Sequence, residues 1–143
     1  MCSTRNVDMV RALGADEVLD YRRDDFTRQQ PYDLVLDLVA HRSVRDCRRA
    51  LAPGGRYRCV GGPARTVLSV LVAGAVVGRL SGRRISVLAV TPGPAHFGPL
   101  AQRCATGEVG IVVDRTFTLA QVPEALAHVG EGRALGKVVV VPG

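Results

Sequence analysis

The sequence predicts an α/β protein built on a parallel β-sheet. Short aliphatic segments alternate with helical segments along most of the chain, which is the pattern of a parallel sheet with right-handed crossover connections. The segment 32–39 is mostly aliphatic and alternates only in part, as expected for a strand that is covered on both faces. Glycine and proline clusters at 53–55 and 61–63 separate consecutive segments.

The N-terminal part contains one expected helix and one expected short strand. The helix is predicted over 6–13, with Asn6 as its N-cap and Gly14 as its stop signal. The strand is predicted over 17–20, followed by a charged loop.

A second helix and strand are expected in the middle of the chain. Ser43, with Asp46 three residues later, resembles a capping box in which Asp replaces the usual Glu or Gln. The glycines and proline at 53–55 are expected to end this helix and to turn the chain into a strand over 56–60.

The next helix is predicted over 65–80 and is strongly apolar. Its uncharged run, Thr66 to Gly78, is thirteen residues long. A membrane span needs about 20 residues, so a buried helix is the preferred interpretation. A strand over 85–90 and a helix over 100–105 are expected after it.

The C-terminal part is expected to form a strand, a helix and a second strand. An extended segment covers 111–119, and Pro123 stands where a first-turn proline of a helix belongs. After a loop over 130–136, Lys137 leads into four valines. These two strands are expected to pair separately from the main sheet or to dock on one end of it.

Composition restricts the classes of protein to consider. The chain has 143 residues, is 47% hydrophobic and carries a net charge of +6, which suits one globular domain. No acid lies between Asp46 and Glu108, an interval that contains nine arginines. Such a basic stretch favours an anionic ligand or is a solvated arginine-rich surface. Aromatic residues make up only 4%, which argues against nucleic-acid binding. No export signal is recognised, so a cytoplasmic location is expected.

The four cysteines do not form a metal-binding pattern. No C-x-x-C pair occurs, and the three histidines are distant from the cysteines in the sequence. Cys47 and Cys59 have apolar neighbours and are expected in the core. We therefore predict no metal site.

An ordered series of short motifs resembles one known superfamily. The motifs are Leu13-Gly-Ala-Asp16, Tyr32-Asp-Leu-Val-Leu-Asp37, Leu51-Ala-Pro-Gly-Gly55, Val60-Gly-Gly62, Val113-Asp-Arg-Thr116, Val122-Pro-Glu-Ala-Leu126 and Gly136-Lys-Val-Val139. Together they resemble the medium-chain dehydrogenase/reductase superfamily, in particular its zinc-independent, quinone-oxidoreductase-like branch. The resemblance covers nearly the whole chain.

The resemblance implies a Rossmann-type parallel sheet with helices on both faces, followed by a strand–helix–strand tail. Residues 1–108 would form a partial NAD(P)-binding domain, and 109–143 would be a tail that in relatives completes the catalytic domain. The first strand and its glycine-rich turn are expected to be missing, because no G-x-G-x-x-G-like sequence is present at the N-terminus. The chain also departs from the family at Ala40-His41, which replaces a common Gly-Asn, and at Arg58, which replaces an apolar residue. Arg58 would need exposure or a partner.

Three residues are candidates for the adenosine end of a dinucleotide. The end of the family's second strand offers Ser3, Thr4 and Arg5, with no acid before Asp8. Hydroxyl and guanidinium groups suit a 2′-phosphate, and the resemblance aligns Ser3, Arg5 and Tyr21 with residues that hold the phosphate of NADPH. Alternatively, Ser3 and Thr4 only precede a helix and Arg5 is solvated.

Other candidates would lie at the nicotinamide. The resemblance places Gly61 and Gly62 beside that ring, with Val39 lining the same pocket, although an ordinary strand-to-helix turn also favours glycine. Lys137 is a phosphate contact or a plain loop charge, and His41 is a proton shuttle or a solvated side chain. No catalytic residue is assigned.

The main functional prediction is an NADPH-dependent oxidoreductase that passes hydride to a quinone, an enone or a similar carbonyl, with little activity in this chain alone. One alternative is a methyltransferase that uses S-adenosylmethionine, because 32–37 and 51–55 also suit that class. Another is a non-catalytic nucleotide-binding or interaction protein. Expected partners are the small-molecule substrate and a homodimer mate or a missing N-terminal half, with neither nucleic acid nor membrane.

Overall fold

The protein consists of two compact units. A computed structural model describes residues 1–29, 31–89 and 93–142. Contacts divide the chain into a sheet unit, formed by residue 1 with 19–91, and a tail unit, formed by 2–18 with 92–143.

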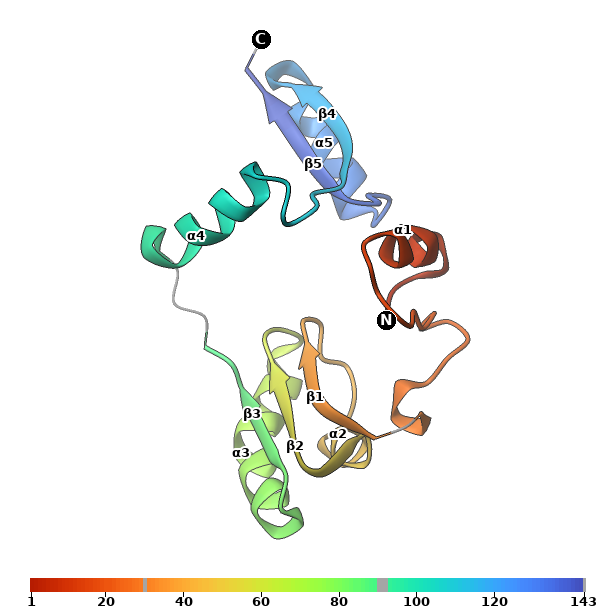
Figure 1. Cartoon of the computed structure of the whole chain (residues 1–143), viewed down its shortest axis with the longest axis vertical. Coiled ribbons are helices and arrows are strands. Elements are labelled where there is room, and N and C mark those ends of the chain that lie inside the picture. Colours follow the sequence, from red (N-terminus) through yellow and green to blue (C-terminus); the bar gives the residue numbers. More distant parts are fainter. Residues whose placement is uncertain (30, 90–92, 143) are drawn as a thin grey trace. The chain divides into compact units, whose positions relative to one another are not determined.

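The sheet unit contains a three-stranded parallel sheet. Its strands are β1 (Tyr32–Asp37), β2 (Leu51–Cys59) and β3 (Arg84–Val87), in the order β1-β2-β3 (Figure 1). Helix α2 (Val44–Arg49) connects the first two strands, and α3 (Ala64–Ser81) connects the last two. The predicted parallel α/β sheet is therefore confirmed. Residue 90 of the expected third strand lies outside the described residues.

Ser43 caps α2 as the sequence predicts. Its Oγ accepts a hydrogen bond from the Asp46 N–H at 3.2 Å and donates one to Asp46 Oδ2 at 2.7 Å. These bonds satisfy a donor that the first turn of a helix would otherwise leave unpaired. Asp46 also accepts a hydrogen bond from Arg49 at 2.7 Å.

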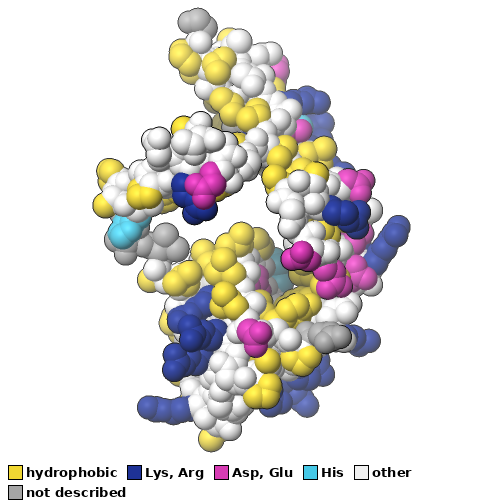
Figure 2. All heavy atoms as spheres, in the orientation of Figure 1, with side chains coloured by type: hydrophobic (Ala, Val, Ile, Leu, Met, Phe, Trp, Pro, Cys, Tyr) yellow, Lys and Arg dark blue, Asp and Glu magenta, His cyan; other side chains and the backbone are white. Residues whose placement is uncertain are grey.

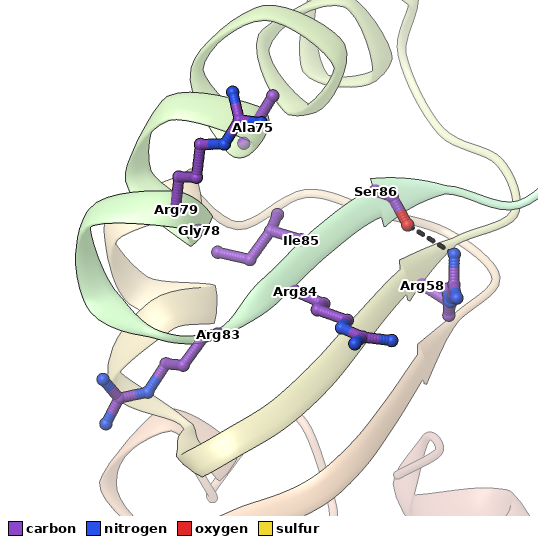
Figure 3. A pocket seen from close by; sticks show the side chains of 9 residues that line it. Arg58, Ala75, Gly78, Arg79, Arg83, Arg84, Ile85 and Ser86 are labelled. Carbon is purple, nitrogen blue, oxygen red and sulfur yellow. Dashed lines mark hydrogen bonds between the residues drawn. The ribbon is translucent and has the colours of Figure 1, made fainter.

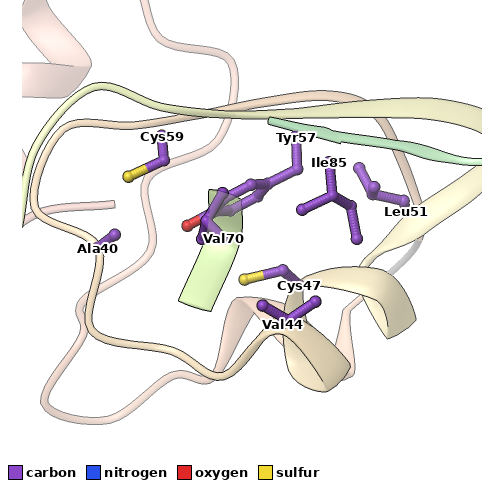
Figure 4. Close-up of a cluster of buried hydrophobic side chains, with 8 residues drawn as sticks. All are labelled: Ala40, Val44, Cys47, Leu51, Tyr57, Cys59, Val70 and Ile85. Atoms are coloured by element: carbon purple, nitrogen blue, oxygen red, sulfur yellow. The ribbon is translucent and has the colours of Figure 1, made fainter. Parts of the chain in front are cut away.

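One face of the sheet carries the core. Tyr57 and Cys59 of β2 and Ile85 of β3 are buried there against Cys47 of α2 and Val70 of α3 (Figure 4). Both helices thus cover the same face. Helices are expected on both faces of the sheet, but within this unit they cover only one. The alternate residues of β1, Leu34 and Leu36, point to the other face and are 61% and 56% exposed.

Strand β2 begins earlier than the sequence indicates. Leu51 already pairs with Tyr32, whereas the next register pair joins Arg56 to Leu34, so the residues between them bulge out. Gly54 has a φ of +78°, and a Cβ on Gly55 would lie 2.9 Å from the carbonyl oxygen of Tyr32. The glycines therefore do not separate helix and strand as predicted. They form an irregular section of the strand itself.

Helix α3 forms as predicted but is not a buried helix. Val70, Gly74 and Gly78 make its buried stripe, at a spacing of four residues. The outward positions remain apolar, as at Leu68 (60% exposed) and Leu80 (85% exposed). Only 17% of the helix is buried, and by length and composition alone it could cross a membrane. The apolar run predicts a buried helix, but within the sheet unit only one side of α3 is buried.

Residues 17–20 do not form the expected strand. Asp20 instead opens a turn in which its carbonyl oxygen accepts hydrogen bonds from the N–H groups of Arg23 and Asp24. Its own N–H donates to the Asp24 carboxyl at 2.8 Å, and its Oδ1 accepts from the N–H of Arg22 at 3.0 Å. Asp20 itself makes only an isolated β-bridge, and the preceding residues 17–19 have no regular structure.

The tail unit confirms the strand–helix–strand prediction. Strands β4 (Val113–Thr118) and β5 (Lys137–Val141) pair in parallel and are connected by α5 (Val122–Gly130). The unit also holds α1 (Val7–Ala12), after which Gly14 has a φ of +95°, and α4 (Pro94–Ala105), which begins six residues before the helix expected over 100–105. Short 3-10 turns are found at Thr4–Asn6 and Leu119–Gln121 in this unit, and at Phe26–Arg28 in the sheet unit.

Candidate cofactor-binding site

The carboxyl ends of β1 and β2 meet at a short turn that contains three of the predicted site residues. Val39 follows β1, and its side chain is 63% exposed. Gly61 and Gly62 follow β2, and the carbonyl oxygen of Gly61 accepts a hydrogen bond from the N–H of Ala40 at 2.9 Å. Ligands of open α/β sheets bind beyond this end of the strands. The structure therefore brings these three residues together where the sequence expects a ligand.

Gly62 is required by the local geometry. Its φ is +144°, and a Cβ would lie 2.7 Å from the carbonyl oxygen of Ala40. Any side chain would strain the backbone and collide with the neighbouring turn. Glycine therefore allows the two strand ends to approach closely.

The buried Tyr57 and the half-buried Asp37 form a polar pair at this turn. The Tyr57 hydroxyl donates a hydrogen bond to Asp37 Oδ2 at 2.7 Å, and the Val39 N–H donates to Asp37 Oδ1 at 3.1 Å. The carbonyl oxygen of Asp37 accepts from the Val60 N–H at 2.8 Å. Asp37 thus contacts the core, the end of its own strand and the end of β2.

Burial changes the acidity of the groups around this pair. Desolvation, followed by the hydrogen bond to Asp37, raises the pKa of Tyr57. Burial also raises the pKa of Cys47 to about 11, although a hydrogen bond with Tyr57 lowers this pKa in part. The pKa of the Cys59 thiol is raised by burial as well. These groups are therefore neutral at physiological pH and act through hydrogen bonds and packing.

The candidates for the adenosine end are divided between the two units. Ser3 and Arg5 belong to the tail unit, whereas Tyr21 belongs to the sheet unit. Ser3 precedes the 3-10 turn at Thr4–Asn6 and accepts the N–H of Asn6 at 2.8 Å with its carbonyl oxygen. The exposed guanidinium of Arg5 donates to the carbonyl oxygen of Gly132. Tyr21 is 52% exposed. Their assignment to a phosphate site stays a prediction.

The two remaining candidates have simple surroundings. His41 is exposed in the loop before α2, beyond the turn at Val39. Lys137 is the exposed first residue of β5, and its N–H donates to the carbonyl oxygen of Val112 at 2.8 Å. A proton-transfer role for His41 and a phosphate contact for Lys137 stay predictions.

The basic stretch of the sequence forms a groove along α3 and β3. Figure 2 shows dark blue basic side chains over this part of the chain, and Figure 3 shows the groove from close by. Its volume is about 360 Å³. Arg58 donates to Ser86 Oγ at 2.7 Å, which supplies the partner that this arginine requires, and Arg83 donates to the carbonyl oxygen of Leu51 at 2.9 Å. The guanidinium groups of Arg79 and Arg83 point apart (Figure 3).

The donor set does not fit a zinc centre. In the described ranges, no group of three or more His, Cys, Asp or Glu side chains could hold a metal ion. We therefore derive no chemistry through a metal.

Sequence reasoning missed Asp37 and Tyr57 as site residues. A weak signal existed, because an acid that ends an apolar strand is typical of a ligand-facing position. No local signal identified Tyr57, which occupies an ordinary alternating position of β2. It meets Asp37 only through the strand register, in which Tyr57 pairs with Val35 and Cys59 pairs with Asp37.

Comparisons with known proteins identify the family of the chain. A family model described as zinc-binding dehydrogenase matches residues 13–140. The chain is 28% identical to the chloroplastic quinone-oxidoreductase QR1 of Triphysaria versicolor, over 99% of this chain and 44% of that protein. It is also 28% identical to the mitochondrial NAD(P)H oxidoreductase RTN4IP1 of Danio rerio, over 97% of this chain and 41% of that protein.

A solved structure shows the same fold. The quinone oxidoreductase of Coxiella burnetii superposes with a TM-score of 0.75 at 25% identity, over 96% of this chain and 42% of that protein. The chain thus spans about two fifths of the length of these relatives. Since the family model matches most of its residues, the chain belongs to the zinc-binding dehydrogenase family, within the medium-chain dehydrogenase/reductase superfamily.

Proposed function

We propose that the chain binds the nicotinamide end of NADPH and serves an oxidoreductase that passes hydride to a quinone, an enone or a similar carbonyl. One observation carries the proposal: Val39, Gly61 and Gly62 meet at the carboxyl ends of two adjacent parallel strands. The exposed Val39 side chain supplies an apolar contact for a flat ring. The flanking glycines let the ring approach the backbone closely.

The nicotinamide cofactor would supply the hydride, and the residues of the chain would orient it. Within the turn, the Val39 N–H is bonded to Asp37 and the Gly61 carbonyl oxygen accepts from the Ala40 N–H, so the turn would contribute the Val39 side chain and the close approach at the glycines. The proposed preference for NADPH over NADH rests on the assignment of Ser3, Arg5 and Tyr21 to the phosphate site. The names of the relatives, which include a quinone-oxidoreductase and an NAD(P)H oxidoreductase, support the cofactor and the acceptor class.

Location is also a proposal. We propose a cytoplasmic setting, whereas two of the relatives are a chloroplastic and a mitochondrial protein. Imaging of the tagged protein in its native cell would decide between the cytoplasm and a membrane-bounded compartment.

Calorimetric titration of the chain with NADPH, NADH and S-adenosylmethionine tests the function. We expect binding of NADPH, weaker binding of NADH and none of S-adenosylmethionine. Val39→Glu places a carboxylate beside the ring site and should weaken NADPH binding. Leu80→Glu, a matched change on the outer side of α3, should not. Binding of S-adenosylmethionine alone would favour the methyltransferase alternative and refute the proposal.

A further inference from the structure

Tyr57 places a hydroxyl group inside the apolar core. Its side chain is fully buried among residues such as Cys47, Val70 and Ile85 (Figure 4). A buried hydroxyl without a partner is unfavourable, and a phenylalanine would fill the same space without that cost. The hydroxyl is therefore best explained by the hydrogen bond that it donates.

That hydrogen bond ends on the residue at which β1 leaves the sheet. Asp37 accepts the Tyr57 hydroxyl with Oδ2 at 2.7 Å and the Val39 N–H with Oδ1 at 3.1 Å. Two hydrogen bonds to separate oxygens fix the plane of the carboxyl group. The carboxyl plane in turn sets the direction in which the backbone of Val39 leaves the strand.

The position of this segment determines where the glycine turn lies. The Ala40 N–H donates to the carbonyl oxygen of Gly61 at 2.9 Å, and a Cβ on Gly62 would lie 2.7 Å from the carbonyl oxygen of Ala40. The Cys59 thiol donates to the same carbonyl oxygen of Gly61 at 3.5 Å. A shift of Val39 and Ala40 therefore has to move Gly61 and Gly62 as well.

We propose that Tyr57 is a positioning residue for the cofactor, which acts through Asp37 to hold Val39 and the Gly61–Gly62 turn as one preformed floor for the nicotinamide ring. The inference rests on the proposed function, because it assumes that the ring lies at this turn. Tyr57 does not itself reach the ligand, since its side chain has no exposed surface. Its effect is preorganisation of the turn before binding.

A positioning role and a purely stabilising role of Tyr57 predict different effects on ligand binding. A core residue that only stabilises the fold should change the binding of all parts of the cofactor alike. A residue that holds the nicotinamide floor should change only the contribution of the nicotinamide. The two cases can be separated with 2′-phospho-ADP-ribose, which has the adenosine end of NADPH and lacks the ring.

The test compares Tyr57→Phe with Tyr32→Phe in the full chain. Both variants lose one tyrosine hydroxyl, but Tyr32 begins β1 and lies at the opposite end of the strand. Calorimetry with NADPH and with 2′-phospho-ADP-ribose gives the contribution of the nicotinamide in each variant. We expect Tyr57→Phe to weaken the binding of NADPH about fivefold, which is the effect of one net hydrogen bond. The affinity for 2′-phospho-ADP-ribose should be unchanged. Tyr32→Phe should change neither.

A second measurement, amide hydrogen exchange, reports on the backbone of the turn itself. Amide hydrogen exchange of Val39 and Ala40 should be faster in Tyr57→Phe than in Tyr32→Phe. If Tyr57→Phe fails to fold, Asp37→Asn takes its place in both measurements, since an amide keeps one acceptor oxygen and cannot serve both donors as a carboxylate does.

The outcomes are distinct. Equal loss of NADPH and fragment binding, or no loss of either, would overturn the positioning role while leaving the proposed function intact. Failure of the unmodified chain to bind NADPH would overturn the proposed function, and this inference with it. Selective loss of the nicotinamide contribution together with faster exchange at Val39 would support both.

Discussion

Nε2 of His128 lies 2.6 Å from Oδ2 of Asp114, which joins the end of α5 to the start of β4. Both side chains are mostly buried, with 10% and 15% of their surfaces exposed, and the Phe117 ring lies beside the imidazole. The hydrogen bond from His128 is the largest influence that holds the pKa of Asp114 below its usual range, with further help from the Leu135 N–H and from Arg115.

Acid should therefore destabilise the tail unit. Because the pKa of Asp114 is lower in the folded chain than in the unfolded chain, its contribution to stability is present above about pH 4 and is lost as the pH falls through the folded value. We expect the unfolding temperature of the tail unit to fall in this range. Asp114→Asn should remove part of this dependence. Asp16→Asn, at an exposed site, should retain it, and identical acid profiles for the two variants would contradict the prediction.

Gly78→Ala should destabilise the sheet unit. A Cβ at this buried position of α3 would lie 2.8 Å from the carbonyl oxygen of Arg83, which is backbone and cannot easily move aside. We expect a loss of about 1–3 kcal/mol in the free energy of unfolding, measured by urea titration, although alanine favours helices. Gly130→Ala in α5 meets no atom within 4 Å. It should be neutral or stabilising, and an equal loss in both variants would refute the steric explanation.

The buried thiols should react slowly. Burial raises the pKa of Cys47 to about 11 and also raises the pKa of Cys59, so both thiolates are scarce at neutral pH. Iodoacetamide at about pH 8 should label the more accessible Cys2 and Cys104 first, as followed by mass spectrometry. All four should react at similar rates in urea. Rapid native labelling of Cys47 would show that its side chain is not buried.

Arg5→Ala should remove most of the preference for NADPH over NADH. A charge-assisted hydrogen bond to the 2′-phosphate contributes about 1.5–3 kcal/mol, which is absent for NADH. The hydrogen bond from Arg5 to Gly132 does not prevent this role, because a guanidinium carries five N–H donors. Arg11→Ala, on the exposed side of α1, is the control. Equal affinity of the unmodified chain for both cofactors would exclude the phosphate contact.

The 143-residue chain alone should oxidise NADPH slowly with a quinone or an enone. Hydride transfer needs the donor and acceptor carbons held in near-attack geometry, and the turn at Val39 and Gly61 supplies only one surface for this. Adding a separately expressed N-terminal half of a complete relative should increase the rate. Fast turnover by the chain alone would show that its own residues complete the acceptor site.

Much of this protein was determined by its sequence alone. The order of strands and helices, the cap at Ser43 and the paired strands of the tail unit follow from hydrophobic periodicity and from local hydrogen bonds. The grouping of Val39 with Gly61 and Gly62 also follows, because adjacent parallel strands end at the same edge. These features depend on residues close together in the sequence, or on the general geometry of a parallel sheet.

Other features were decided by the tertiary structure. The turn at Asp20 replaced a predicted strand, and α3 buried only one stripe, because the outcome depended on which neighbouring surface was available. The contact between Tyr57 and Asp37 joins residues twenty positions apart through a register that the bulge after Leu51 sets. A local pattern contains no information about that register. It is fixed when the helices and strands pack together, because a slip of one residue would turn the buried side chains of β2 out of the core.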